Sequence, residues 1–246
     1  MALFGKKSKN EAPETDASEV ATDIEVTDAA DAPERFDDLV AAESTTEVEA
    51  VAAAAGLDVA KSAPVDRAAN GPLDETEANA VRPYIDLGGI KVLPREGLQL
   101  RLEVEEGTQR VVAVGLDFGG SNLQVQPFSA PRSSGLWNAT RAEVREQIEA
   151  QGGTVEEHVG GLGPELLATI PTSAGASTVR RARFVGVDGP RWFLRGVIGG
   201  SGVDEPEGRD QIDELFRSIV VVRGVQPMPP RDLIPLQVPA AAQADS

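Results

Sequence analysis

The chain has 246 residues, a net charge of −17 at pH 7, a single histidine and no cysteine. This composition excludes a disulfide framework and thiolate metal sites, and one histidine is too few for most zinc, haem and Ser-His-Asp sites. The length suits one large domain or two small ones, so the distribution of residue types along the chain has to decide.

The first 80 residues carry most of the negative charge. They contain 19 acidic and 6 basic residues, but only two aromatic residues, Phe4 and Phe36. A segment of this composition buries too little apolar surface to offset its chain entropy. We therefore expect residues 1–81 to form a long disordered acidic tail and linker, with a transient helix over residues 35–61.

The start of the chain is basic rather than apolar. Residues 1–9, from Met1 to Lys9, place three lysines after a short apolar patch, which is not the order of a signal peptide. Weak contact of these residues with a membrane surface is the alternative to an ordinary solvated tail. No window of about 18 apolar residues occurs, so we expect no membrane span.

Prolines and glycines between residues 62 and 82 mark a linker. The aromatic residues are concentrated after it, so we expect one α+β domain over residues 82–239 and a disordered C-terminus over residues 240–246. Period-two alternation then predicts strands at about 99–105, 110–116 and 122–128, with Gly119 and Gly120 in the turn between the last two.

A short amphipathic helix is expected within the stretch NATRAEVREQIEAQGG, residues 138–153. Thr140 and Glu143 have the spacing of a capping box, and Gly152 is suited to the C-terminal end. Four further strands are expected at 154–159, 165–170, 179–187 and 191–198, the last two joined by a turn at Asp188 and Gly189. A second helix is expected over residues 210–220, because apolar side chains recur there at i, i+3, i+4 and i+7, namely Ile212, Leu215, Phe216 and Ile219.

This order of elements predicts the fold class. Runs of antiparallel strands with two helices gathered on one face form an α+β sandwich, whereas the alternation of strand and helix typical of a parallel sheet is missing. We expect Trp137 and Trp192 in the core, and His158 as an exposed strand residue.

Five segments carry a family resemblance: RPYIDLGGIKVLP from residue 82, APRSSGLW from 130, QGGTVEE from 151, RFVGVDGPRWFLRGVIGG from 183 and RSIVVVRGVQPMPPRDLIPL from 217. Together they resemble the actinobacterial domain of unknown function 3710 family over nearly all of residues 82–239. The resemblance implies no established activity and no site residues. The element order is similar to the PsbP-like sandwich, which implies a fold used mainly by non-catalytic binding and assembly factors.

The first candidate site is the sequence DFGGSN, from Asp117 to Asn122, which follows a strand. It resembles the turn that opens the nucleotide site of sugar kinases and actin-like ATPases. That superfamily also needs motifs in a second half, but only 124 residues follow here, and residues 123–128 are expected to form a strand rather than a phosphate-binding helix. We interpret the segment as a β-hairpin, with nucleotide binding or a sugar-kinase-like enzyme as the alternative.

The second candidate site is an arginine-rich pair of strands. Arg181 and Arg183 share one face of a strand, and Arg191, Phe193 and Arg195 share a face of the next. Guanidinium groups beside an aromatic ring can bind an anion or a protein partner. The alternatives are a solvated sheet face and a surface onto which the acidic tail folds back.

Three aspartates form a candidate carboxylate cluster for a metal ion. Asp86, Asp117 and Asp188 each lie close to a glycine in a turn-like context, where aspartate favours local hydrogen bonds. We therefore expect no metal site.

The sequence predicts a cytosolic, non-catalytic interaction or regulatory module. We expect no cofactor, an unknown protein partner, and no nucleic-acid partner for a chain that is acidic as a whole.

Overall fold

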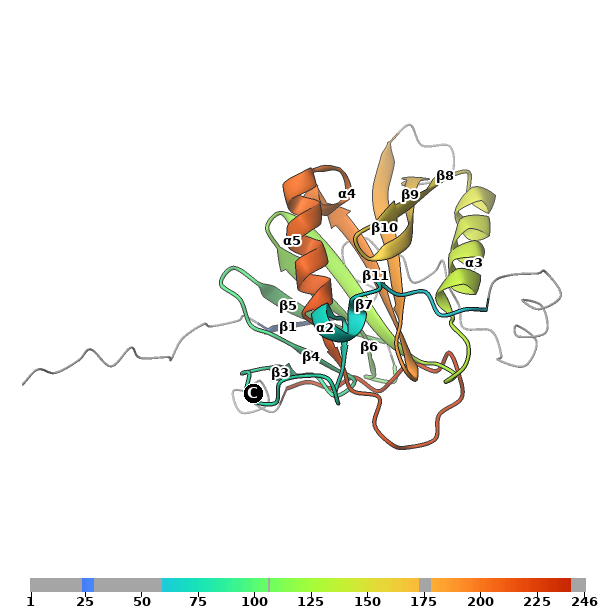
Figure 1. The fold of residues 1–246 in the computed structure, drawn as a ribbon. Helices are drawn as coiled ribbons and strands as arrows, with labels where there is room; N and C mark the ends of the chain where they lie inside the picture. Colours follow the sequence, from blue (N-terminus) through green and yellow to red (C-terminus); the bar gives the residue numbers. More distant parts are fainter. Residues whose placement is uncertain (1–23, 29–58, 106, 173–177, 240–246) are drawn as a thin grey trace, which may run out of the picture.

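Most strands belong to one eight-stranded sheet in the computed structural model, which describes residues 24–28, 59–105, 107–172 and 178–239 (Figure 1). The strand order is β1-β5-β6-β7-β11-β10-β9-β8. All neighbours are antiparallel except β1 and β5, which are parallel. The strands are β1 (Ile24–Asp28), β5 (Gln99–Val104), β6 (Val111–Phe118), β7 (Ser121–Ser129), β8 (Thr154–Gly160), β9 (Gly163–Pro171), β10 (Val179–Asp188) and β11 (Trp192–Gly200).

The seven strands predicted between residues 99 and 198 are confirmed, and the α+β class with them. A second sheet with the order β2-β12-β4-β3 was not predicted. Its strands have only two or three residues, which is too short for an alternation signal. They are β2 (Leu73–Asp74), β3 (Ile85–Asp86), β4 (Ile90–Val92) and β12 (Val220–Val221).

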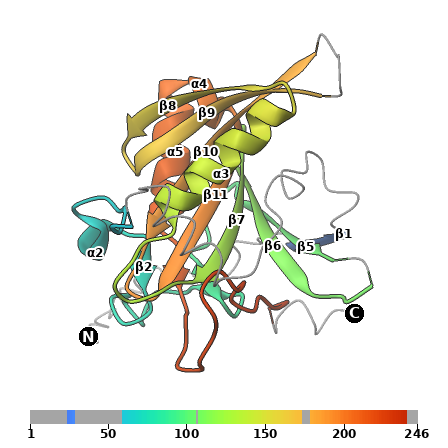
Figure 2. The same ribbon diagram turned by 90° about the vertical axis from the view of Figure 1, so that its right-hand side faces the viewer.

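The two long helices, α3 (Trp137–Ala150) and α5 (Pro206–Arg217), lie on opposite faces of the large sheet (Figures 1 and 2). On β10, Val185 belongs to the core that contains Phe216 of α5, whereas the adjacent Phe184 belongs to the core that contains Trp137 of α3. The expectation that both helices gather on one face is therefore wrong. β10 and β11 are buried on both sides, and the nearly continuous apolar run of β11 was the local signal for a second covering layer. We call the two sides the α3 face and the α5 face.

Two short helices complete the fold: α2 (Arg67–Asn70) and α4 (Ser201–Asp204). The predicted core tryptophans, Trp137 and Trp192, are both fully buried. Within the described ranges, no helix is long and apolar enough to cross a membrane.

The start of α3 differs from the capping-box prediction. The helix begins at Trp137, so Thr140 lies inside it, and the side chain of Glu143 binds Arg231 instead. The predicted end is confirmed, because Gly152 has a positive φ of 82° directly after the helix. A buried carboxylate from β10 replaces the local cap, as described below.

Part of the stretch assigned to the tail and linker contributes elements to the fold. β1 pairs with β5, and residues 59–82 run along the sheets and supply α2 and β2. Their partners are distant in sequence, so local composition could not reveal the pairing. The predictions for residues 1–9 and 240–246, and for residues 35–58 of the helix expected over 35–61, lie outside the described residues.

The β6–β7 connection is a two-residue hairpin turn, as predicted. Asp117 pairs with Asn122 and Phe118 with Ser121, which leaves Gly119 and Gly120 in the turn with φ values of 58° and 77°. Both residues lie in the left-handed region that suits the turn preferred by twisted hairpins.

Substitution of Gly119 by valine is expected to lower the free energy of unfolding by about 1–2 kcal/mol, because a β-branched residue is strained at positive φ. Gly119→Asn is the matched control: it adds the same Cβ beside Gln211, but asparagine tolerates this conformation. Urea unfolding measures both variants. Equal losses of stability in the two variants would show that glycine is required at position 119 because a Cβ would crowd Gln211, and not because of the backbone conformation.

Candidate functional site

The N-terminus of α3 is held by the buried carboxylate of Asp188, at the end of β10. Its Oδ1 accepts a hydrogen bond from the Leu136 N–H at 2.8 Å, and its Oδ2 accepts from Trp137 at 3.4 Å and from Ser62 at 2.9 Å. Burial raises the pKa of Asp188, against the opposing effect of these backbone donors. The carboxylate thus joins β10, α3 and the segment before α2 at one point.

Lys61 fixes the same segment to the β10–β11 turn. Its ammonium donates hydrogen bonds to the carbonyl oxygens of Gly189 and, at 2.8 Å, Pro190. Burial lowers the pKa of Lys61, while the nearby Asp188 carboxylate opposes this shift. Residues 61 and 62 therefore form a fixed wall beside α3.

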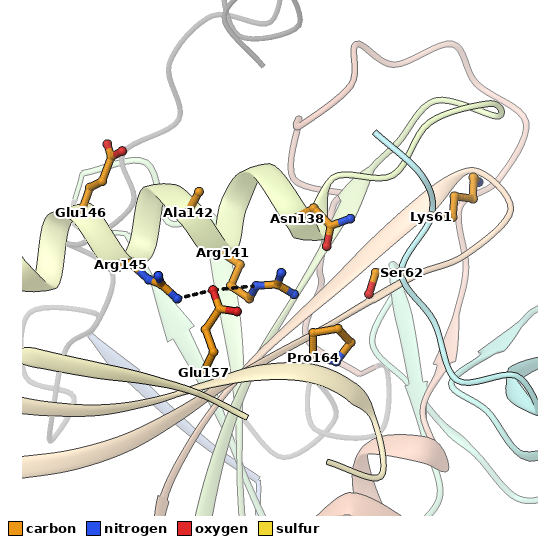
Figure 3. A pocket seen from close by; sticks show the side chains of 9 residues that line it. All are labelled: Lys61, Ser62, Asn138, Arg141, Ala142, Arg145, Glu146, Glu157 and Pro164. Atoms are coloured by element: carbon orange, nitrogen blue, oxygen red, sulfur yellow. Dashed lines mark hydrogen bonds and ion pairs between the residues drawn. The ribbon is translucent and has the colours of Figure 1, made fainter. Parts of the chain in front are cut away.

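A groove of about 610 Å³ lies between this wall, α3 and the β8–β9 strands (Figure 3). We call it the α3 groove. Arg141 and Arg145, one helical turn apart, point from α3 toward Glu157 on β8. Arg145 forms an ion pair with Glu157, and Arg141 Nε lies 3.8 Å from the same carboxylate. Its lining residues are Lys61, Ser62, Asn138, Arg141, Ala142, Arg145, Glu146, Glu157 and Pro164.

The arginines of the α3 groove have donors to spare. Nη1 of Arg141 and Nε of Arg145 are buried and have no hydrogen-bond partner among the described residues. A buried donor left unpaired costs about 1–3 kcal/mol, so an acceptor that reaches it gains affinity. The lining also has three cationic side chains against two carboxylates. The arrangement can therefore bind a carboxylate or a phosphate.

A larger hollow of about 790 Å³ lies at the C-terminal end of α5. Two of its arginines are occupied by neighbours: Arg95 contacts Glu214 at 3.2 Å, and Arg217 donates to Asp66 and to backbone oxygens. A third lining arginine, Arg82, is exposed, and none of the described side chains that line this hollow has a buried donor without a partner.

The structure does not bring the predicted arginine site to one surface. Arg183 is fully buried and faces α5, while Arg195 and Phe193 are buried on the opposite α3 face. Arg181 is exposed and forms an ion pair with Asp204. Arg191 donates to the carbonyl oxygen of Gly224 at 2.7 Å. Binding of a partner by this set stays a prediction that no observation tests.

Arg183 belongs to an ion network instead. Its Nε lies 2.8 Å from Glu165, and its Nη2 lies 2.6 Å from Asp213 on α5. Glu165, also fully buried, forms a second ion pair with Arg209. The network connects β9, β10 and α5.

The three aspartates considered for a metal ion lie in different surroundings. Asp86 accepts from the N–H of Gly88, a local bond of the predicted kind, whereas Asp117 pairs with Arg101 across β5 and β6. Asp188 makes the distant contacts described above. Across the described ranges, no group of three or more His, Asp or Glu side chains is placed to share a metal ion. His158 is exposed on β8, as predicted.

The α3 groove was missed by the sequence analysis. The available signal was the spacing of Arg141 and Arg145, which places both on one side of a helix. The position of Glu157 opposite them depends on how α3 lies along β8, and no local pattern carries that information.

Residues 71–245 match the family described as Protein of unknown function (DUF3710). No curated protein and no solved structure matches the chain. The actinobacterial origin and the PsbP-like element order therefore stay predictions.

Proposed function

Because the chain belongs to the DUF3710 family of proteins of unknown function, we propose a role from its own side chains: a non-catalytic interaction module that binds an acidic protein segment in the α3 groove. One observation carries the proposal, namely the buried and unpaired donors of Arg141 and Arg145. Guanidinium groups bind carboxylates in a fixed planar geometry, which suits recognition of acidic side chains.

The fixed surroundings of the α3 groove support a docking role. Asp188 holds the start of α3, and Lys61 is bound to two carbonyl oxygens, so the wall needs no rearrangement to receive a ligand. A preorganised site loses less entropy on binding. The proposal places the protein in the cytosol, in keeping with a chain that contains no cysteine.

We expect the full-length protein to bind a labelled oligoglutamate peptide, and the Arg141→Gln, Arg145→Gln double variant to bind it about a hundredfold more weakly. Each lost charged hydrogen bond is worth roughly a factor of ten. Fluorescence anisotropy measures the affinities. Glu157→Gln should strengthen binding, since it frees both arginines from their carboxylate.

The matched control is the double variant Arg110→Gln, Arg132→Gln, which removes the same charge from exposed positions outside the α3 groove. It is expected to change the affinity little. Equal losses in the two double variants would reduce the effect to net charge, and an unchanged affinity in the groove variant would overturn the proposal.

A further inference from the structure

β8 forms one edge of the large sheet (Figure 2). Its seven residues, Thr154–Gly160, pair with β9 on one side. Among the described residues, no strand pairs with its other side. The backbone N–H and carbonyl groups on the outer side of an edge strand can pair with a further strand. The side chains of β8 determine which strand fits there.

Three side chains of β8 are exposed and without a partner. Val159 is 75% exposed. Glu156 and His158 are exposed as well, and neither forms a hydrogen bond or an ion pair with another described residue. These side chains are free to contact another chain.

Alternation divides the side chains of β8 between the two faces of the sheet. Val155 packs against the core that contains α3, and Glu157 forms an ion pair with an arginine of α3, so both lie on the α3 face. Val159, two residues after Glu157, lies on this face too. Glu156 and His158 lie on the α5 face.

The sequence of β8 is symmetric in its chemistry about Glu157. In an antiparallel pair with a second copy of β8, Glu157 can lie opposite the same residue of that copy. Val155 then lies opposite Val159, and the reverse, on the α3 face. Glu156 lies opposite His158, again twice, on the α5 face. Apolar and polar cross-strand pairs of this kind stabilise a sheet, and two-fold symmetry makes the surface complementary to itself.

The two Glu157 carboxylates meet at the two-fold axis, and each is accompanied by cations from its own chain. Arg145 forms an ion pair with Glu157, and Nε of Arg141 lies 3.8 Å from the same carboxylate. Charged residues on an edge strand ordinarily oppose association. Here the charge at the centre is neutralised by α3, so it does not prevent pairing.

Other symmetric registers lose these contacts. With Glu156 at the axis, two carboxylates without a cation lie directly opposite each other, and Val159 lies opposite a residue outside β8. With His158 at the axis, Val159 lies opposite the charged Glu157. β8 therefore favours a single register.

We propose that β8 pairs with β8 of a second copy of this chain, antiparallel about Glu157, and so joins the two large sheets into one continuous sheet. The proposal concerns the edge of the sheet and does not rest on the proposed function. Glu157 also lines the α3 groove, so the dimer brings the two grooves side by side at the axis.

Sedimentation equilibrium of the full chain at about 100 μM, a concentration at which micromolar complexes form, should give twice the single-chain mass of 25.8 kDa. His158→Glu places two carboxylates opposite each other in both outer pairs, so the mass should return to that of one chain. Ser133→Glu, on an exposed loop, adds the same charge and should leave the dimer intact. A single-chain mass for the unsubstituted protein, or a dimer that survives His158→Glu, would overturn the proposal.

A charge swap tests which residues meet. The double variant Glu156→Lys, His158→Lys should be monomeric alone, because lysines lie opposite lysines. Mixed with His158→Glu, it should form a heterodimer, because each lysine then lies opposite a glutamate. A mixture that contains only single chains would contradict the pairing of residues 156 and 158.

Single cysteines report the register directly, because the chain contains none of its own. Under oxidising conditions, a mixture of Val155→Cys and Val159→Cys should form a disulfide between chains, since strand neighbours lie within disulfide distance. Each variant alone should stay uncross-linked. Val179→Cys, at an exposed position of β10, is the control and should cross-link with neither. Cross-linking of Val159→Cys with itself, or none in the mixture, would contradict the register.

Discussion

Replacement of Arg183 by methionine is expected to lower the free energy of unfolding by about 3–5 kcal/mol, the cost of breaking a buried ion pair from one side. Arg183 and Glu165 are both fully buried, and the guanidinium also contacts Asp213 at 2.6 Å. Methionine keeps much of the length of the arginine side chain but not its charge. Glu165 would then have only Arg209 as an ion-pair partner, and Asp213 would lose its ion pair with residue 183. Burial already raises the pKa of Asp213 against the effect of Arg183, and the substitution should raise it further.

Arg181→Met is the matched control, two residues earlier on the same face of β10. Arg181 is half exposed and pairs with the exposed Asp204, so its loss should cost at most about 1 kcal/mol. Urea unfolding compares the two variants. In the double variant Arg183→Met, Asp213→Leu, part of the loss should be recovered, since Asp213 is no longer an unpaired carboxylate. Equal losses from Arg181→Met and Arg183→Met would contradict a stabilising network.

Asp188→Ala is expected to cost about 2–4 kcal/mol, since it leaves three backbone N–H groups without an acceptor. They belong to Ser62, Leu136 and Trp137. Asp86→Ala is the control: that carboxylate is exposed, accepts a local bond from Gly88 and lies 3.9 Å from the ammonium of Lys91, so a change within about 0.5 kcal/mol is expected.

The loss from Asp188→Ala should also depend on pH. Burial raises the folded-state pKa of Asp188 above 3.8, so the folded protein binds more protons than the unfolded chain between the two values. The stability contributed by Asp188 is therefore fully present below pH 3.8 and decreases as the pH rises through the folded pKa. Unfolding of both proteins across this range measures the difference. If the stability difference between the unsubstituted protein and Asp188→Ala instead grew with pH, the backbone hydrogen bonds would lower the pKa of Asp188 more than burial raises it.

The strands and the second helix could be predicted from the sequence because residues close together in the chain determine them. Alternation over residues 110–128 together with Gly119 and Gly120 requires a hairpin, and Ile212, Leu215 and Phe216 form one buried side of α5. The arrangement of the layers was not accessible in this way. The nearly continuous apolar run of β11 indicates burial on both faces, but it does not say which helix covers which face.

The candidate sites show the same limit. In the sequence, Arg183 alternates with apolar residues like an exposed strand residue, and its burial depends on Glu165 and Asp213, 18 and 30 residues away. The α3 groove depends on Arg145 meeting Glu157 across α3 and β8. Charge pairing between elements decides both cases, and it becomes visible only when the elements are placed.

The wall formed by Lys61 and Ser62 makes the α3 groove a composite of two parts of the chain. The family match begins at residue 71, after this wall, while both groove arginines lie inside the matched region. Substitutions before residue 71 can therefore change the shape of the groove while the guanidinium groups stay in place. A protein shortened to residues 71–246 would retain Arg141 and Arg145 but lose one side of the groove and one donor to Asp188. Ligand selectivity measured on that shortened protein would differ from that of the whole chain.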